Sequence, residues 1–183
     1  MKIINPLENY TKDENDVVCF LGGAFSSSNK WRNDVILFLE NIEKDKTLSL
    51  DKLVIINPFR KDWNTKNPSD EDLNNEIKWE IKMQNDSDIF VSYFDKNDKD
   101  NLPLSLFELG NNMINIKVKF GNNKINYRIL PYAHPDYQFF NDLKFQLEAL
   151  TERWKTPITL ESTEKNITSL ASKILESYVK VSK

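Results

Sequence analysis

The chain has 183 residues, of which 39% are hydrophobic and 29% charged, and its net charge is −3. The length fits one ordinary domain spanning residues 1–183, and the composition excludes a disordered chain and a basic, nucleic-acid-binding face. One cysteine and one histidine exclude a disulfide framework and argue against a zinc site, which needs three or four such ligands. We therefore expect metal-free chemistry on a small molecule.

The N-terminal region predicts neither secretion nor membrane insertion. No apolar run is long enough to cross a membrane, and the first residues are polar and acidic where a signal peptide would be basic and then apolar. We expect a cytoplasmic protein in which residues 1–15 form a loosely ordered lead-in.

Short apolar runs alternate with helical segments along the chain. The runs predict strands at 17–21, 53–56, 89–94 and 124–130, and a weak one at 156–160. Capping and periodicity predict helices at 31–42, 70–84, 102–110, 137–154 and 164–181. Strands that read as continuous apolar runs are typical of a parallel sheet covered on both faces. The predicted fold is α/β: a flavodoxin-like, doubly wound, five-stranded parallel sheet of order 2-1-3-4-5 in three α/β/α layers.

In such a fold, ligands bind beyond the carboxyl ends of the strands, where the loops 22–28, 57–63 and 95–102 are expected to converge. Gly22 and Gly23 follow the first strand, at a point where the close approach of a ligand would forbid side chains. The same pair equally fits an ordinary strand-to-helix turn. It is neither a GxGxxG fingerprint nor a P-loop, so dinucleotide or triphosphate binding is not predicted.

The helix at 70–84 places a carboxylate in an awkward position. At about 100° per residue, Glu80 falls within an apolar face, one turn after Glu76. A buried glutamate has a raised pKa unless it finds partners, which suits it to hold or shuttle a proton. The other interpretation is that either carboxylate reaches water or pairs with Arg60 or Lys61. The apolar face is predicted to contain Leu73, Ile77, Ile81 and Gln84.

The helix that begins near Pro103 carries a polar stripe of Ser105, Glu108 and Asn112. A helix start is a ready site for a phosphate or a sugar hydroxyl, and a carboxylate beside it is well placed to attack a sugar carbon. Glu108 is therefore the candidate nucleophile. The alternative is that the stripe is merely the water-facing side of a surface helix. The core face is predicted to contain Leu106, Phe107, Leu109, Met113 and Ile114.

Five motifs stand in register between residues 17 and 140. They are Cys19-Phe-Leu-Gly-Gly-Ala24, Asn57-Pro-Phe-Arg-Lys-Asp-Trp63, Ile77-Lys-Trp-Glu80 with Asp86-Ser-Asp88-Ile, Pro103-Leu-Ser-Leu-Phe-Glu-Leu-Gly110, and Ile129-Leu-Pro-Tyr-Ala-His-Pro-Asp-Tyr137. In this order they resemble the nucleoside 2-deoxyribosyltransferase family, including relatives that hydrolyse the N-glycosidic bond of deoxynucleoside monophosphates. At Leu102, where several family members carry an acid, and at Cys19-Phe20, where some carry a tyrosine, the chain departs from the pattern.

The resemblance implies that Glu108 attacks the anomeric carbon to give a glycosyl-enzyme and that Glu80 protonates the departing base. Ser105 would contact the 5′ end of the sugar or its phosphate. The retaining displacement would need no metal or organic cofactor. Together with the converging loops, the resemblance implies substrate contacts at Gly22, Gly23, Ala24, Phe25, Phe59, Arg60, Trp63, Ser105 and Asn112.

The resemblance also implies the partners of the protein. The substrate would be a small nucleoside or nucleotide, with no membrane and no polymeric nucleic acid involved. The chain would form a homodimer whose partner closes the site. The alternative function on the same fold is a non-catalytic protein that binds a nucleotide or a nucleotide-derived signal.

Overall fold

The computed structural model describes residues 1–23, 30–60, 68–96, 102–121, 128–154, 158–162 and 167–182, with the backbone alone at 102, 103 and 115–121. Within these ranges the strands are β1 (Lys2–Ile4), β2 (Val17–Gly23), β3 (Leu53–Ile56), β4 (Ile89–Phe94), β5 (Arg128–Ala133) and β6 (Glu161–Ser162). The helices are α1 (Lys30–Lys44), α2 (Asp70–Asp86), α3 (Leu102–Gly121), α4 (Phe140–Trp154) and α5 (Thr168–Val181). Strands and helices largely alternate along the chain, as the sequence predicted.

The described strands form one parallel sheet in the order β1-β3-β2-β4-β5-β6. Val18 of β2 pairs with Val54 of β3, and Leu21 of β2 pairs with Val91 of β4. Without β1, this is the predicted order 2-1-3-4-5. The chain leaves β2 toward β3 on one side and later returns to β4 on the other, so the switch point lies at the carboxyl end of β2.

The sheet has six strands where the sequence predicted five, because residues 2–4 add β1 at the edge, parallel to β3. Ile4 and Tyr10, in the lead-in, are buried in the core. The side chain of Trp79 on α2 also donates a hydrogen bond to the Glu8 carbonyl, over 3.0 Å. The sequence did not reveal the strand because three residues are too few to show a hydrophobic period.

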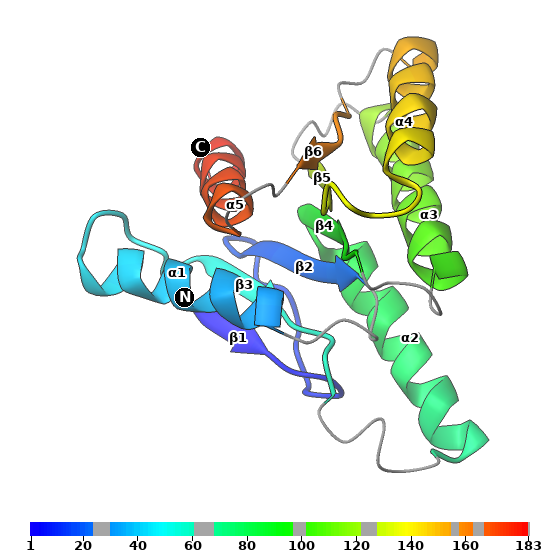
Figure 1. Cartoon of the computed structure of the whole chain (residues 1–183). Coiled ribbons are helices and arrows are strands. Elements are labelled where there is room, and N and C mark those ends of the chain that lie inside the picture. Colours follow the sequence, from blue (N-terminus) through cyan, green and yellow to red (C-terminus); the bar gives the residue numbers. More distant parts are fainter. Residues whose placement is uncertain are drawn as a thin grey trace.

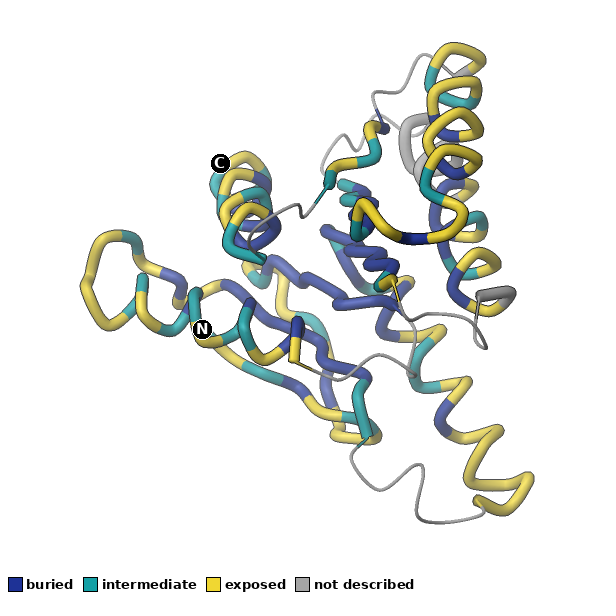
Figure 2. Tube along the Cα trace, viewed as in Figure 1, coloured by how far each residue is buried: buried dark blue, intermediate teal, exposed yellow. Residues whose placement is uncertain are grey.

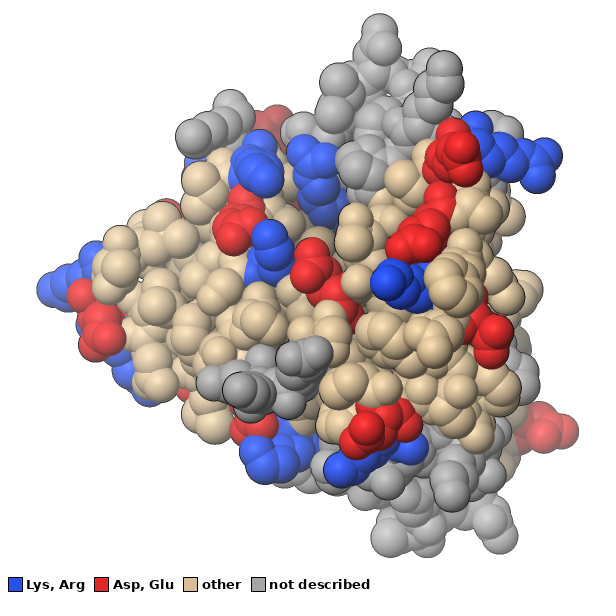
Figure 3. Space-filling model, turned by 45° about the horizontal axis from the view of Figure 1, so that its top comes forward, with Lys and Arg blue, Asp and Glu red and all other residues tan. Residues whose placement is uncertain are grey.

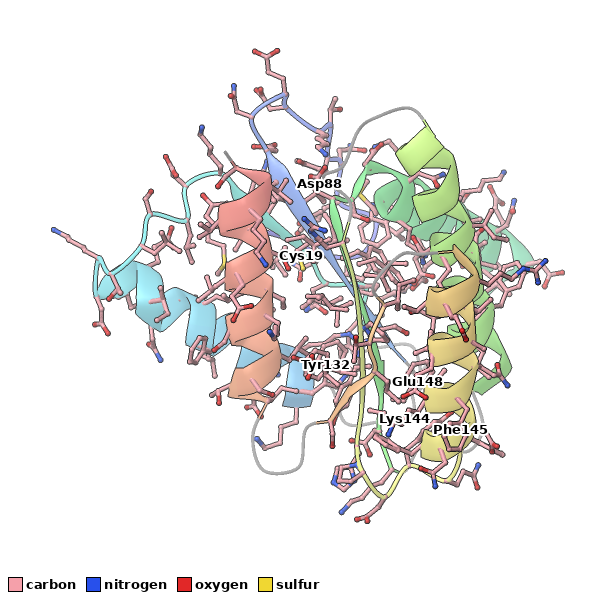
Figure 4. The ribbon with its side chains drawn as sticks, turned by 90° about the horizontal axis from the view of Figure 1, so that it is seen from above. Cys19, Asp88, Tyr132, Lys144, Phe145 and Glu148 are labelled. Carbon is pink, nitrogen blue, oxygen red and sulfur yellow. The ribbon has the colours of Figure 1, made fainter. Side chains whose placement is uncertain are left out.

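Helices cover both faces of the sheet, which confirms the predicted three layers (Figure 1; seen from above in Figure 4). Successive side chains of β2 enter opposite cores: Phe20 packs in the core beneath α2, α3 and α4, and Cys19 in the core beneath α1 and α5. Every residue of β2, β3 and β4 is buried (Figure 2), which explains their continuous apolar runs.

Among the described residues, β5 ends three residues after its predicted end and β6 begins after the predicted segment, while residues 124–127 and 156–157 lie outside the described residues. β5 continues through Pro131, although proline has no N–H to donate to a neighbouring strand. The amides of Arg128 and His134 both donate to carbonyls on the β4 side, so the alternation along the strand turns the nitrogen of Pro131 toward β6. β6 pairs only from Tyr132 onward, and no hydrogen bond is therefore lost. The segments predicted from the sequence are 124–130 and 156–160.

The surface charges are mixed in sign. On the face drawn in Figure 3, lysine and arginine side chains are interspersed with aspartate and glutamate side chains. Some pair along a helix, such as Lys82 with Asp86 at 2.8 Å on α2. None of the described helices is long and apolar enough to cross a membrane.

Candidate active site

Two glycines bring bare backbone to the carboxyl end of β2. A Cβ on Gly22 would lie 2.7 Å from the carbonyl oxygen of Val91, and one on Gly23 would lie 2.7 Å from that of Tyr93. Gly23 also has a φ of 148°, which side-chain-bearing residues rarely adopt. The pair is thus required by the packing of β2 against β4 whether or not a ligand approaches it.

Glu80 of α2 and Glu108 of α3 face a common space, although 28 residues separate them in the chain. Both line a cavity of about 530 Å³ that lies between α2 and α3. Both also line a narrow pocket at the end of β2, together with Gly22, Gly23 and Ser105. The structure therefore brings together five of the residues that the sequence singled out.

Burial perturbs both carboxyl groups. It raises the pKa of Glu80 to about 8, and the negative charges of Glu108 and then Glu76 act in the same direction. Burial also raises the pKa of Glu108, to about 6. A hydrogen bond from Gln84 and the charge of Arg32 lower this pKa and so oppose part of the rise. At neutral pH the pair can hold one proton on Glu80 while Glu108 is ionised.

Arg32 is a residue of this site that the sequence did not reveal. It lies in the first turn of α1 and is fully buried. Its Nε donates to the carbonyl of Leu21 over 3.1 Å and its Nη2 to that of Gly23 over 2.8 Å, and the guanidinium lies 4.5 Å from the Trp31 ring centre. Its charge lowers the pKa of both catalytic candidates. An arginine on a predicted surface helix carries no sequence signal for such burial.

Gln84 and Asn112 surround the Glu108 carboxylate. Gln84 Nε2 donates to Glu108 Oε1 over 3.1 Å. Asn112 Nδ2 donates both to Gln84 Oε1 and to the Glu108 carbonyl, each over 2.9 Å. Asn112, which was predicted as a substrate contact, is fully buried in the substrate-free protein and donates to Gln84. Gln84 was predicted to lie on an apolar face.

The polar stripe of α3 faces the protein interior. Ser105 and Asn112 are buried, which excludes the alternative that the stripe is the water-facing side of a surface helix. The predicted core face is correct for Leu109 and Met113, which are buried, and wrong for the rest. Leu106, Phe107 and Ile114 are exposed. Hydrogen bonds to α2 determine which side of α3 faces the interior, and hydrophobic periodicity cannot predict such bonds.

The prediction for α2 is wrong in the same way. Leu73, Ile77 and Ile81, predicted to face the core, are 39%, 46% and 50% exposed, whereas Glu76 is buried. The outer half of α2 is accordingly mostly exposed in Figure 2. Glu76 accepts a hydrogen bond from Arg60 over 2.9 Å, so for this carboxylate the pairing interpretation is the one observed. The apolar stripe lines the cavity and does not join the sheet core.

The remaining predicted contacts divide into two groups. Phe59 and Arg60 follow β3 and are half-buried, and the amide of Phe59 donates to Asn57 Oδ1 over 3.4 Å. Arg60 reaches the site through its pair with Glu76, which lines the cavity. Ala24, Phe25 and Trp63 lie outside the described residues. Among the residues that the structure places, no cluster of three or more histidine, cysteine or acidic side chains is arranged to hold a metal ion.

Comparison with protein-family models assigns most of this region to a known family. A family model described as nucleoside 2-deoxyribosyltransferase like matches residues 16–121, which extend from the start of β2 to the end of α3. This range contains the two glycines, Arg32 and both perturbed carboxyl groups. A search of curated proteins finds no match.

Proposed function

Because the chain belongs to the nucleoside 2-deoxyribosyltransferase-like family, we propose that it cleaves or transfers at the N-glycosidic bond of a (deoxy)nucleoside or nucleotide. Glu108 is the nucleophile in this proposal and Glu80 is the general acid. The observation that carries the proposal is the placement of both carboxyl groups on one cavity, with pKa values of about 6 and about 8. Paired groups whose pKa values are pushed apart around neutrality are typical of acid–base catalysis.

The proposed reaction has two displacements. An oxygen of the Glu108 carboxylate attacks C1′, the bond from C1′ to the base nitrogen breaks, and the Glu80 carboxyl proton passes to the departing base. The product is a glycosyl ester on Glu108. Water then attacks C1′ while Glu80 takes its proton, or a second base attacks in its place. Glu108 leaves in either case, and two inversions give net retention.

The two connected pockets suggest where each half of the substrate binds. The narrow pocket has a volume of only about 10 Å³, so we place the sugar at its mouth, beside Gly22, Gly23 and Ser105, with Ser105 at the 5′ side. The larger cavity begins at the same two carboxyl groups and is lined by apolar side chains, so it suits the flat face of a base. Arg60 pairs with Glu76, which lines this cavity, so we place a polar group of the base on that side.

We also propose that the protein is a homodimer through the apolar surface around the cavity. Phe107 is 70% exposed and Leu104 is 52% exposed, and both lie across the cavity from the exposed stripe of α2. Large apolar side chains gathered in this way on two adjacent helices are typical of an interface. A second copy placed there would cover the base and exclude water from the two carboxyl groups.

The test is incubation of the protein with a panel of nucleosides and 5′-monophosphates, with and without an acceptor base. Released base identifies a hydrolase, and exchanged base identifies a transferase. Glu108→Gln should abolish turnover, and Glu80→Gln should slow it about 100- to 10,000-fold, because general acid catalysis typically contributes that much. Glu71→Gln, at an exposed position in the first turn of α2, is the matched control.

Two outcomes would overturn the proposal. The first is full turnover by Glu108→Gln. The second is saturable binding of a nucleotide by the wild type without release or exchange of base across the panel, which would identify a non-catalytic binding protein on this fold.

A further inference from the structure

A chain of three hydrogen bonds connects α2 and α3 behind the candidate nucleophile. Asn112 and Gln84 are almost completely buried, at 0% and 4% exposure. The Asn112 amide nitrogen contacts the Glu108 carbonyl and Gln84 Oε1, and Gln84 Nε2 contacts Glu108 Oε1. One buried amide therefore donates to the Glu108 carboxylate, and a second buried amide donates to the first.

The direction of these bonds is determined by the backbone. The Glu108 carbonyl can only accept, so the amide group that Asn112 turns toward it must be the NH₂ end. The same nitrogen has a second hydrogen, which it donates to Gln84 Oε1. With its oxygen engaged in this way, Gln84 must present its NH₂ end to Glu108. Asn112 thus makes Gln84 a donor, and a donor binds the ionised carboxylate better than the protonated one.

We propose that Gln84 is a positioning residue for the nucleophile and that Asn112 fixes the orientation of Gln84. Gln84 holds Oε1 of Glu108, which leaves Oε2 to attack C1′. This inference rests on the proposed function and deepens it by naming the groups that orient the attacking oxygen. It also gives a reason for two polar side chains at positions where an apolar residue would pack with less desolvation cost.

The other charged groups near Glu108 do not fix the position of its carboxylate by a described hydrogen bond. Glu80, on α2, keeps its proton at neutral pH, and the charge of Arg32, on α1, lowers the pKa of Glu108. Glu76, also on α2, is paired with Arg60. Gln84 donates a hydrogen bond to the Glu108 carboxylate. Burial raises the pKa of Glu108 and this bond opposes the rise, so removal of the bond should alter both the rate and its pH dependence.

The test compares Gln84→Met, which keeps the length of the side chain and removes its donor, with Gln84→Glu, which adds a third carboxyl group. Gln84→Met should lower kcat about 10- to 100-fold, the equivalent of one hydrogen bond to a charged group, with KM changed less than about threefold. The acid limb of the kcat profile should move to higher pH in Gln84→Met and further in Gln84→Glu. Asn112→Leu should repeat the Gln84→Met effects, because Gln84 is then free to turn.

Met83→Leu is the control for packing, since Met83 is the buried core residue adjacent to Gln84 on α2. It should lower the melting temperature without moving the acid limb. A titration of the Glu108 carboxyl carbon by NMR in substrate-free protein gives a readout independent of turnover, and its midpoint should rise in Gln84→Met.

The outcomes separate this inference from the proposed function. If the wild type releases no base from any substrate, the nucleophile role of Glu108 fails and the inference fails with it. If the wild type turns over and Gln84→Met matches it in kcat and in the acid limb, the positioning role alone is overturned. A lower melting temperature in Gln84→Met with an unmoved acid limb and an unmoved NMR midpoint would also overturn it.

Discussion

The carboxyl groups of Glu80 and Glu108 line the same cavity, and the negative charge of Glu108 helps to raise the pKa of Glu80. Burial is the larger cause for both residues. The two groups therefore lose their protons in order as pH rises, with Glu108 ionising near pH 6 and Glu80 near pH 8. Between these values the site holds one nucleophile and one acid.

The first prediction follows from this order of ionisation. Turnover should show a bell-shaped dependence on pH, because the rate falls below about pH 6 as Glu108 becomes protonated and above about pH 8 as Glu80 loses its proton. The measurement is kcat/KM for base release between pH 4.5 and 9.5 at constant ionic strength. In Glu80→Gln the alkaline limb should disappear and the acid limb should remain. A profile that is flat from pH 5 to pH 9 would contradict both assignments.

The second prediction concerns stability. The folded pKa of Glu80 is about 8 and its ordinary value is 4.5, so between these pH values the folded protein keeps a proton that the unfolded chain has lost. Stability from this group is therefore fully present below pH 4.5 and is lost as pH rises through 8. Glu80→Gln removes the effect, so it should be more stable than the wild type at pH 9 by about 1–4 kcal/mol. Urea unfolding at pH 5 and pH 9 measures the difference.

The control for this comparison is Glu71→Gln, whose side chain is exposed on the same helix. Its stability difference from the wild type should be the same at both pH values. An equal effect of Glu80→Gln at pH 5 and pH 9 would show that the carboxyl group is not desolvated in the folded protein.

The third prediction tests the glycines of β2. Gly22→Ala should lower the free energy of unfolding by about 1–3 kcal/mol, because its Cβ would lie 2.7 Å from the carbonyl oxygen of Val91. Gly110→Ala is the matched control: a Cβ there meets no atom within 4 Å, and alanine is the better helix former. Chemical denaturation should show the first variant destabilised and the second unchanged or stabilised by up to about 1 kcal/mol. Equal stability of the two variants would contradict the close packing of β2 against β4.

The fourth prediction tests the proposed dimer. Phe107→Glu places a charge in the exposed apolar surface beside the cavity and should convert a dimer into a monomer. Phe145→Glu, at a 62% exposed position on α4 (labelled in Figure 4), should leave the dimer intact. Sedimentation velocity at several protein concentrations measures both. A monomeric wild type, or dimers that persist in Phe107→Glu, would remove this surface from consideration as the interface.

Much of the fold could be predicted because the strands of a buried parallel sheet carry their own signal. Val17–Leu21, Leu53–Ile56 and Ile89–Phe94 read as strands because every residue in them is buried, and turn and capping residues bounded the helices between them. Ser69 caps α2 as predicted, since its Oγ accepts from the amide of Asp72 over 3.1 Å. β1 and β6 are two or three residues long, too short for any period to be read.

The candidate site was predicted in part. Gly22, Gly23, Glu80, Ser105 and Glu108 meet in space as the motif order predicted, because the carboxyl ends of parallel strands and the following helices share one edge of the sheet. Arg32 and Gln84 were missed as site residues. Arg32 is a polar side chain on a helix, a pattern that normally indicates a water-facing position. Gln84 was placed on the apolar face of its helix, but the periodicity gave no sign of its hydrogen bond to Glu108.

The sequence by itself predicted the order of the five strands β3-β2-β4-β5-β6 and the three layers, and it singled out Glu80 and Glu108 as candidates. These predictions depend on local periodicity and on the order of motifs along the chain. The tertiary structure decided which side of α2 and α3 faces the sheet. Hydrophobic periodicity indicates only that a face avoids water. Leu73, Ile77 and Ile81 of α2 line the cavity together with Glu76 and Gln84, but the first three are exposed there, whereas Glu76 and Gln84 are buried. Burial of Glu80 itself raises its pKa, and the buried amide of Gln84 donates to Glu108. Burial depends on contacts between residues far apart in the chain.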